Sequence, residues 1–160
     1  MSQGIMYTCP FTVTGATAIQ DLFQLIPGAD TVICVHEAHI GQETELGDAA
    51  AEMLDIEISR FEDAFTEGSG GAAGAEEPLH KGSGTAKTVV EVNNTTVATS
   101  GTQAVLKRDT FHVAAGYHYV PLPSSRVWVG PTDAFILRLD TAPDDAIDLR
   151  GYIVWEEFSG

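Results

Sequence analysis

Alternation between apolar and polar residues predicts β-strands along most of this sequence. In residues 54–61, Leu54, Ile56 and Ile58 take every second position, with mostly polar or charged side chains between them. Because successive side chains of a strand point to opposite faces, this pattern is typical of a half-buried strand. Residues 135–140 repeat it. Apolar and β-branched runs predict further strands at 5–14, 19–26, 31–40, 87–96, 105–113, 117–122, 127–129 and 149–158.

Short turn sequences separate these runs. Gly, Pro, Asn, Asp and Ser gather at 27–30, 93–94, 100–101, 115–116, 130–131 and 143–145. Many short strands with frequent turns are typical of a sandwich or a barrel. Only residues 44–53 favour a helix, and it is too short for the crossover of a βαβ unit. We therefore predict one all-β domain over residues 1–160, a jelly-roll-like antiparallel β-sandwich or barrel.

Residues 67–84 interrupt the strand pattern with a long glycine-rich segment. A loop of this length inside a compact domain is typically either functional or mobile, and its composition leaves a purely structural role open. We expect an exposed, flexible arm between two strands that contacts a partner. The candidate partner-binding residues in it are Glu67, Gly70, Gly71, Glu76, Glu77 and His80.

The charge narrows the choice of partners. The chain has 23 acidic and 8 basic residues, a formal net charge of −15. Nucleic acids and anionic membranes are bound through Lys and Arg, so we expect neither as a partner. Twelve acidic residues lie between Glu37 and Glu77, where Arg60 is the only basic one. This region is either a solvated face or a patch that meets a basic partner.

The compartment follows from features that the sequence lacks. No apolar run approaches the length of a membrane span, and the first residues do not resemble a signal peptide. We therefore expect synthesis in a cytoplasm. In that reducing compartment Cys9 and Cys34, which both lie in strand-like stretches, are expected to be two buried thiols.

His36, His39 and Glu43 form the most suggestive group of potential metal ligands, and they resemble the first metal motif of cupins. The two histidines are three positions apart, however, so a regular strand would point them to opposite faces unless a bulge intervenes. Two acidic clusters lack the spacing of a known Ca²⁺ loop; they are Glu43, Glu45, Asp48 and Glu52, and Asp140, Asp144, Asp145 and Asp148. We expect no metal and no cofactor.

Aromatic residues offer one further candidate site. Tyr117, Tyr119 and Trp128 could line a contact with a sugar or a protein, or they could pack in the core. The sequence contains no P-loop, GxSxG, HExxH or EF-hand pattern, and we expect no enzymatic activity.

Several segments together resemble a family. They are residues 18–23, His36 to Gln42, Gly47-Asp48 leading into 54–60, Val90 to Thr96, Phe111 to Tyr117, Pro121-Leu122-Pro123 and Trp155 to Phe158. In these segments, which run along almost the whole chain, the sequence is similar to small β-rich proteins encoded by tailed bacteriophages and prophages.

The resemblance implies a virion component, and a capsid decoration (cement) protein in particular. Such a protein would clamp neighbouring major capsid subunits on the outer surface of the head, as a homo-oligomer and preferably a trimer. The expected location is thus the capsid exterior, after synthesis in the host cytoplasm. The alternatives are a tail-fibre or carbohydrate-binding module, suggested by the aromatic residues, and a cupin-like metalloenzyme, suggested by the histidines.

Overall fold

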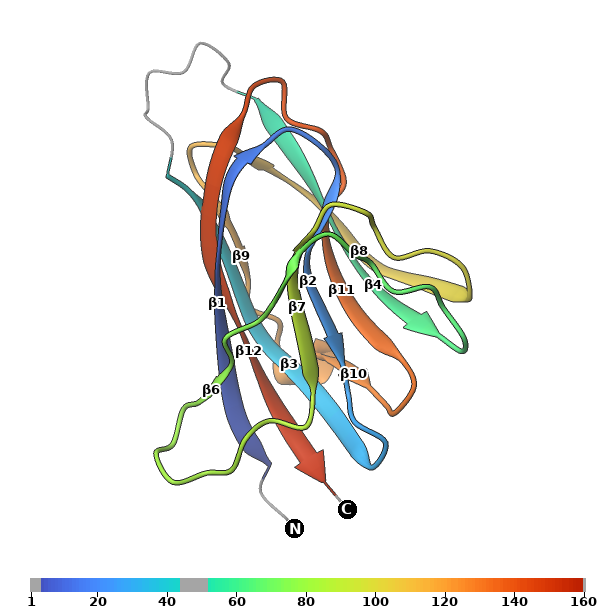
Figure 1. The fold of residues 1–160 in the computed structure, drawn as a ribbon. Coiled ribbons are helices and arrows are strands. Elements are labelled where there is room, and N and C mark those ends of the chain that lie inside the picture. The colour runs from blue at the N-terminus through green and yellow to red at the C-terminus, as the bar shows by residue number, and fades with distance from the viewer. Residues whose placement is uncertain (1–3, 44–51, 160) are drawn as a thin grey trace.

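Two antiparallel sheets packed face to face contain most of residues 4–43 and 52–159, the residues that the computed structural model describes (Figure 1). Sheet A contains β1 (Ile5–Ala16), β3 (Thr31–Gln42), β6 (Glu77–Pro78), β9 (Tyr117–Tyr119), β10 (Val127–Val129) and β12 (Ile147–Ser159). Sheet B contains β2 (Gln20–Ile26), β4 (Met53–Glu62), β5 (Ala72–Ala73), β7 (Val89–Asn94), β8 (Thr102–His112) and β11 (Ala134–Leu139). The prediction of an all-β sandwich is confirmed.

The pairing order is that of a jelly roll. β9 and β10 pair with the same edge of β3, so they form two halves of one interrupted strand. With these halves counted together, β1, β12, β3 and β9/β10 are neighbours in one sheet, and β2, β11, β4 and β8 are neighbours in the other. This is the arrangement of an eight-stranded jelly roll. The chain between β4 and β8, which includes β5, β6 and β7, is an insertion into it.

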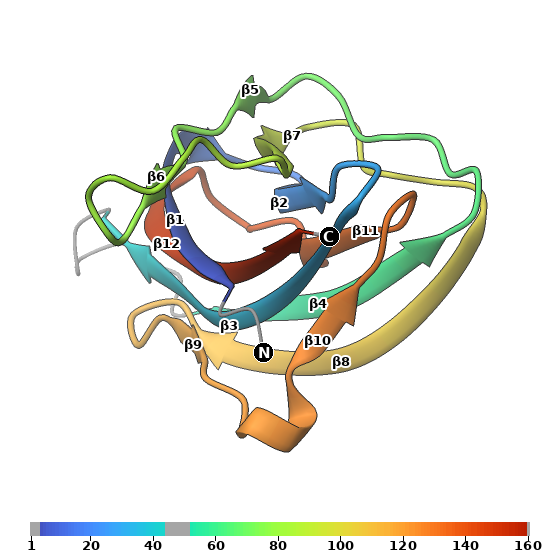
Figure 2. The same cartoon turned by 90° about the horizontal axis from the view of Figure 1, so that it is seen from below.

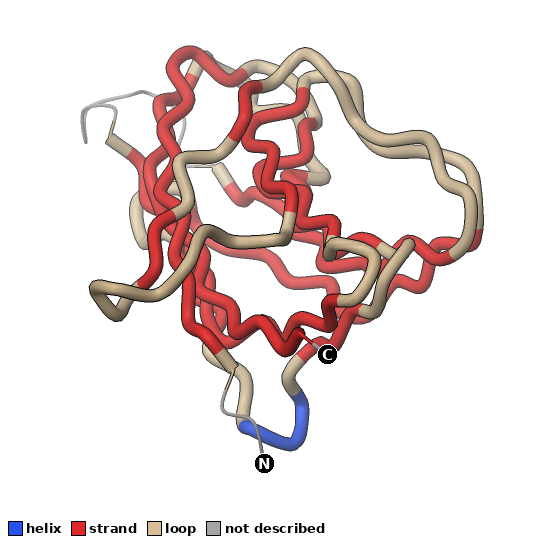
Figure 3. The backbone as a smooth tube through the Cα atoms, turned by 60° about the horizontal axis from the view of Figure 1, so that its bottom comes forward, coloured by secondary structure: helices blue, strands red, loops and turns tan. Residues whose placement is uncertain are grey.

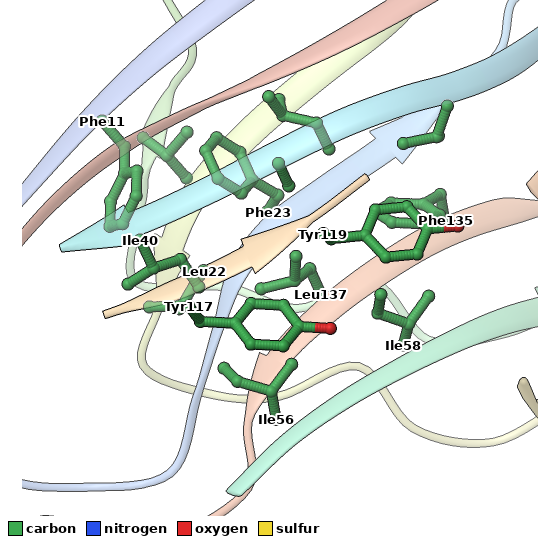
Figure 4. Close-up of a cluster of buried hydrophobic side chains, with 14 of the residues drawn as sticks. Phe11, Leu22, Phe23, Ile40, Ile56, Ile58, Tyr117, Tyr119, Phe135 and Leu137 are labelled. Atoms are coloured by element: carbon green, nitrogen blue, oxygen red, sulfur yellow. The ribbon is translucent and has the colours of Figure 1, made fainter. Parts of the chain in front are cut away.

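The apolar positions of the alternating strands form the core between the sheets. Ile56, Ile58 and Leu137 are at most 1% exposed, as the alternation predicts. Figure 4 shows these side chains gathered between strands of the two sheets. Trp155 on β12 is fully buried, and its ring stacks on Tyr7 with the centroids 5.8 Å apart.

Some predicted boundaries were wrong. The predicted strand 117–122 ends at Tyr119, because Pro121 and Pro123 have no amide hydrogen to donate to a ladder. A short 3₁₀-helix, η1 (Pro123–Ser125), follows (Figure 3). The helix predicted at 44–53 falls largely on residues 44–51, which lie outside the described residues, and Met53 begins β4.

A second, smaller core lies on the outer face of sheet B. Ala134, Ile136 and Phe61 point to that face and are covered by Ala98 from the insertion. Beside them, the buried carboxylate of Asp21 accepts hydrogen bonds from the insertion's backbone and from a neighbouring arginine. The insertion therefore covers sheet B rather than extending into solvent.

The glycine-rich segment is attached to both sheets. We call residues 66–79 the strap. Its β5 pairs with β7 at the edge of sheet B, and its β6 pairs with β1 at the edge of sheet A. Figure 2 shows the strap passing across one side of the sandwich. The segment is exposed at most of its positions, as expected, but it is not a free arm, because β5 and β6 attach it to the two sheet edges; its flexibility stays a prediction.

We expect Gly71→Ala to detach the strap locally. A Cβ at Gly71 would lie 2.2 Å from the carbonyl oxygen of Val92, a contact that forces the backbone to shift. Overpacking of this kind costs about 1–3 kcal/mol. Hydrogen exchange should show faster exchange of the Gly74 amide, which donates to Val90. Gly84→Ala is the control, since a Cβ there meets nothing within 4 Å. Unchanged exchange in Gly71→Ala would contradict the prediction.

The cysteines are two buried, unpaired thiols, as predicted. Burial raises the pKa of the Cys9 thiol to about 11, so this thiol is protonated and poorly nucleophilic at neutral pH. Among the described residues there is no helix of the length and apolar character needed to cross a membrane.

Candidate interaction surface

The residues predicted to bind a partner are spread along the glycine-rich segment. Glu67, Gly70 and Gly71 lie where it meets sheet B, whereas Glu77 and His80 lie near the edge of sheet A. All five are exposed. Glu76, between these two groups, is half-buried. They do not form one compact patch, and their contact with a partner stays a prediction.

The potential metal ligands do not converge. The register of β3 with β12 skips His36, and this bulge leaves both His36 and His39 on the outer face of sheet A. There His36 Nε2 lies 3.1 Å from the carboxylate of Glu156. Glu43 instead pairs with Arg150. In the described part of the chain, no group of three or more His, Cys, Asp and Glu side chains could hold a metal ion.

His39 belongs to a different contact on the same face. Its ring stacks on Tyr152 with the centroids 5.8 Å apart and meets His118 edge-on at 5.4 Å. The hydroxyl of Tyr152 donates a hydrogen bond to Glu37, which raises the pKa of Tyr152. This cluster ties β3, β9 and β12 together across the sheet.

The two acidic clusters lie next to each other, since the amide of Glu43 donates a hydrogen bond to the carbonyl oxygen of Asp148. Asp148 accepts a hydrogen bond from the amide of Gly15, and Glu52 accepts one from the amide of Asp144. Glu45 and Asp48 lie outside the described residues. A shallow hollow near the beginning of β4 is lined by Asp55, Ile56, Arg108, Asp109, Thr110 and Asp140.

The three predicted aromatic residues are split between the core and the surface. Tyr117 and Tyr119 point inward against the core (Figure 4), and burial raises the pKa of each hydroxyl to about 12. Trp128 points outward, is 50% exposed, and stacks on Phe158 with the centroids 5.3 Å apart. The split follows from the alternation of β10, in which the neighbours of Trp128 are the buried residues Val127 and Val129.

Several large apolar side chains are exposed on the side of the sandwich opposite the strap. Here β8 forms the edge of sheet B, and the connection from β9 through η1 to β10 protrudes from sheet A (Figure 2). Leu122, at 73%, and Val120 are well exposed on this connection, and Leu106 is exposed on β8. Together with Lys107, Arg126 and Trp128 they form what we call the open side. Exposed apolar side chains that gather in one place are typical of protein contact sites.

A hollow of about 320 Å³ lies on the open side between the two sheet edges. It is lined by Arg60, Leu106, Lys107, Ser125, Arg126, Val127 and Trp128. Lys107 and Leu106 come from β8 of sheet B, whereas Trp128 comes from β10 of sheet A and Arg126 immediately precedes that strand. The connection from β9 to β10 builds one wall, since Ser125 is held against Leu122 by two hydrogen bonds.

The hollow is basic although the chain is strongly acidic. Arg60 is paired with Glu62, with Nε 2.8 Å from the carboxylate oxygen. Lys107 has no ion pair with the described residues, and its ammonium lies 5.7 Å from the centre of the Tyr119 ring. The buried Nε of Arg126 has no hydrogen-bond partner among the described residues. Two cationic side chains are thus available to a ligand.

Sequence reasoning missed this hollow because its residues come from three separate segments. Half of the eight Lys and Arg residues, at positions 60, 107, 108 and 126, lie in β4, in β8 and immediately before β10. This concentration was a signal in the sequence, and only the pairing of β4 with β8 brings its members together.

Comparison with protein-family models, curated proteins and solved structures gives no match for this chain.

Proposed function

We propose that this chain is a non-enzymatic structural protein of a tailed-phage virion, a capsid decoration protein that binds the major capsid protein on the outside of the head. In this proposal it acts as a homotrimer and stabilises contacts between capsid subunits. The observation that carries the proposal is the open side, where Leu122, Val120 and Trp128 are exposed beside an unpaired strand edge. The choice of a capsid partner rests on the resemblance of the sequence to phage proteins.

Two features of the molecule support a structural role. The jelly roll is a rigid scaffold that is shared by viral capsid proteins, lectins and cupins, so it is compatible with the proposal without selecting it. The net charge of −15 would keep coated particles dispersed in solution. Repetition over a capsid lattice would let many modest contacts add up to stable binding.

We expect Leu122→Ser to weaken binding to heads at least about tenfold, because a central apolar side chain of an interface contributes strongly to affinity. The measurement is the amount of protein retained on purified heads as its concentration falls. Val89→Ser is the control, since Val89 is also exposed (58%) but lies on β7, away from the open side. Equal retention of both variants would contradict the assignment of the contact to the open side.

The capsid role itself is tested on virions. Imaging should show the protein on the exterior of heads, and heads that lack it should release their contents at a lower temperature. Absence from heads, or equal robustness without the protein, would refute the role. If binding instead responds to Glu77→Ala and His80→Ala, the contact lies on the side of the glycine-rich segment.

One observation favours a second candidate, a carbohydrate-binding module of the tail. Trp128 and Phe158 form a stacked pair on the outer face of sheet A, and exposed aromatic rings are common in sugar contacts. This candidate requires labelling that places the protein on the tail, together with glycan binding that is lost in Trp128→Ala.

A further inference from the structure

We infer that the hollow on the open side binds an acidic side chain of the partner. The extended segment that carries this side chain pairs with the free edge of β8. This inference rests on the proposed function, because it specifies the chemistry of the partner at the contact surface. It adds that the partner contributes a carboxylate and a strand to a site where this otherwise acidic chain is locally basic.

The two cations in the hollow differ from the neighbouring arginines in having no counter-ion. Neighbouring arginines are already neutralised, since Arg60 pairs with Glu62 and Arg108 pairs with Glu57. Lys107 and Arg126 have no such partner in the described part of the chain. Hydrogen bonds between a guanidinium and a carboxylate are among the strongest in proteins. A carboxylate in the hollow would supply the counter-ion that Lys107 and Arg126 lack.

The size and lining of the hollow suit an acidic side chain. Its volume of about 320 Å³ is at the lower end of the range of ligand pockets, which suits a side chain rather than a large cofactor. Leu106 and Trp128 provide apolar walls next to the cations. This combination fits the aliphatic part and the charged end of a glutamate or aspartate.

The free edge of β8 can accept the strand that carries this side chain. This strand has eleven residues and pairs only with β4, so the backbone groups on its other edge have no strand partner among the described residues. The other sheet edges are less suitable: β5 and β6 have two residues each, and β9 and β10 are separated by prolines. A long unpaired edge is the usual site for addition of a strand from a partner.

The charge on β8 also selects the partner. Lys107 and Arg108 are consecutive residues of this edge strand. Charged residues on an edge strand normally discourage pairing with other strands. A neutral or basic segment would leave Lys107 without a counter-ion beside a desolvated contact, whereas an acidic segment would pair with it. The same residues therefore disfavour pairing with neutral or basic strands and favour pairing with an acidic strand.

The test uses the full chain and a blocked heptapeptide in which valine alternates with glutamate. Binding should shift the amide resonances of β8 and the indole resonance of Trp128 in nuclear magnetic resonance spectra. A matched peptide with glutamine in place of glutamate should bind at least about tenfold more weakly, because charged hydrogen bonds are lost. The double variant Lys107→Gln/Arg126→Gln should show a similar loss for the acidic peptide. Arg150→Gln is the control, since Arg150 pairs with Glu43 and does not line the hollow.

Three outcomes would overturn the inference. The first is equal binding of the two peptides, or no binding of the acidic one. The second is binding that the double variant leaves unchanged. The third is self-association that the double variant abolishes in sedimentation, which would make a second copy of this chain the occupant. If the acidic peptide does not bind while the protein is retained on heads, only this inference fails. If the peptide binds and the protein is absent from heads, only the capsid role fails.

Discussion

Arg138→Met is expected to lower the free energy of unfolding by about 3–5 kcal/mol, because removal of one partner of a buried ion pair leaves the other charge uncompensated. Arg138 Nε lies 2.6 Å from the carboxylate of Asp21, whose side chain is fully buried. The same guanidinium donates to the carbonyl oxygen of Ala98, 2.9 Å away. Loss of Arg138 therefore also weakens the attachment of the insertion to the outer face of sheet B.

Urea denaturation followed by circular dichroism measures this effect as a lower midpoint. Arg150→Gln is a matched control, because its pair with Glu43 is exposed and such pairs contribute about 0–1 kcal/mol. The double variant Asp21→Leu/Arg138→Met should be less destabilised than the sum of its two single changes, since it leaves no unpaired charge. Equal stability of Arg138→Met and Arg150→Gln would show that the buried pair is not needed.

Trp155→Ala is expected to cost about 3–5 kcal/mol, the usual range for deletion of a large aromatic side chain from a core. Trp155 is fully buried and stacked on Tyr7, and its indole N–H faces the buried carboxylate of Glu157 at 3.4 Å. Its removal leaves a cavity in the core beneath β12, the central strand of sheet A. Trp155→Phe should lose less, because it retains most of the ring contact.

The chain contains a matched control for this change in its second tryptophan. Trp128 also stacks on an aromatic ring, but it is half-exposed, so Trp128→Ala should cost only about 1 kcal/mol. Fluorescence separates the two residues, because the single tryptophan remaining in Trp128→Ala is buried and should emit at a shorter wavelength. Comparable destabilisation by the two alanine changes would contradict the assignment of Trp155 to the core.

The strands could be predicted because their signal is local. Ile56 and Leu137 alternate with polar neighbours, and this pattern alone determines which side chains enter the core. The same pattern predicts that the polar residues of these strands face solvent. This prediction was wrong for several polar residues, which are buried. Glu57 is 3% exposed, because Gln103 and Arg108 of β8 lie over its carboxylate and bond to it.

The strap, the bulge at His36 and the hollow depend on contacts between segments that are distant in the sequence. The position of the strap depends on free space at two sheet edges, which the composition of residues 67–84 does not reveal. At the bulge, Val154 and Trp155 of β12 face Glu37 and Val35, so His36 has no residue opposite it. This depends on how β3 pairs with β12 and cannot be predicted from the sequence of β3 alone. The hollow requires β8 and β10 to meet, although they are separated in the sequence by a buried strand and an irregular connection.

The pairing of β3 with β12 has a consequence for synthesis in the cell. Thr31 lies opposite Ser159, and β12 also provides the partner of β1, so sheet A has no central strand until β12 leaves the ribosome. Until then β1 and β3 each lack their longest strand partner and expose an edge that is prone to wrong contacts. Folding is therefore expected to be slow, as is typical of domains with many long-range strand pairs. Truncation before β12 should yield aggregated chains rather than a smaller folded domain.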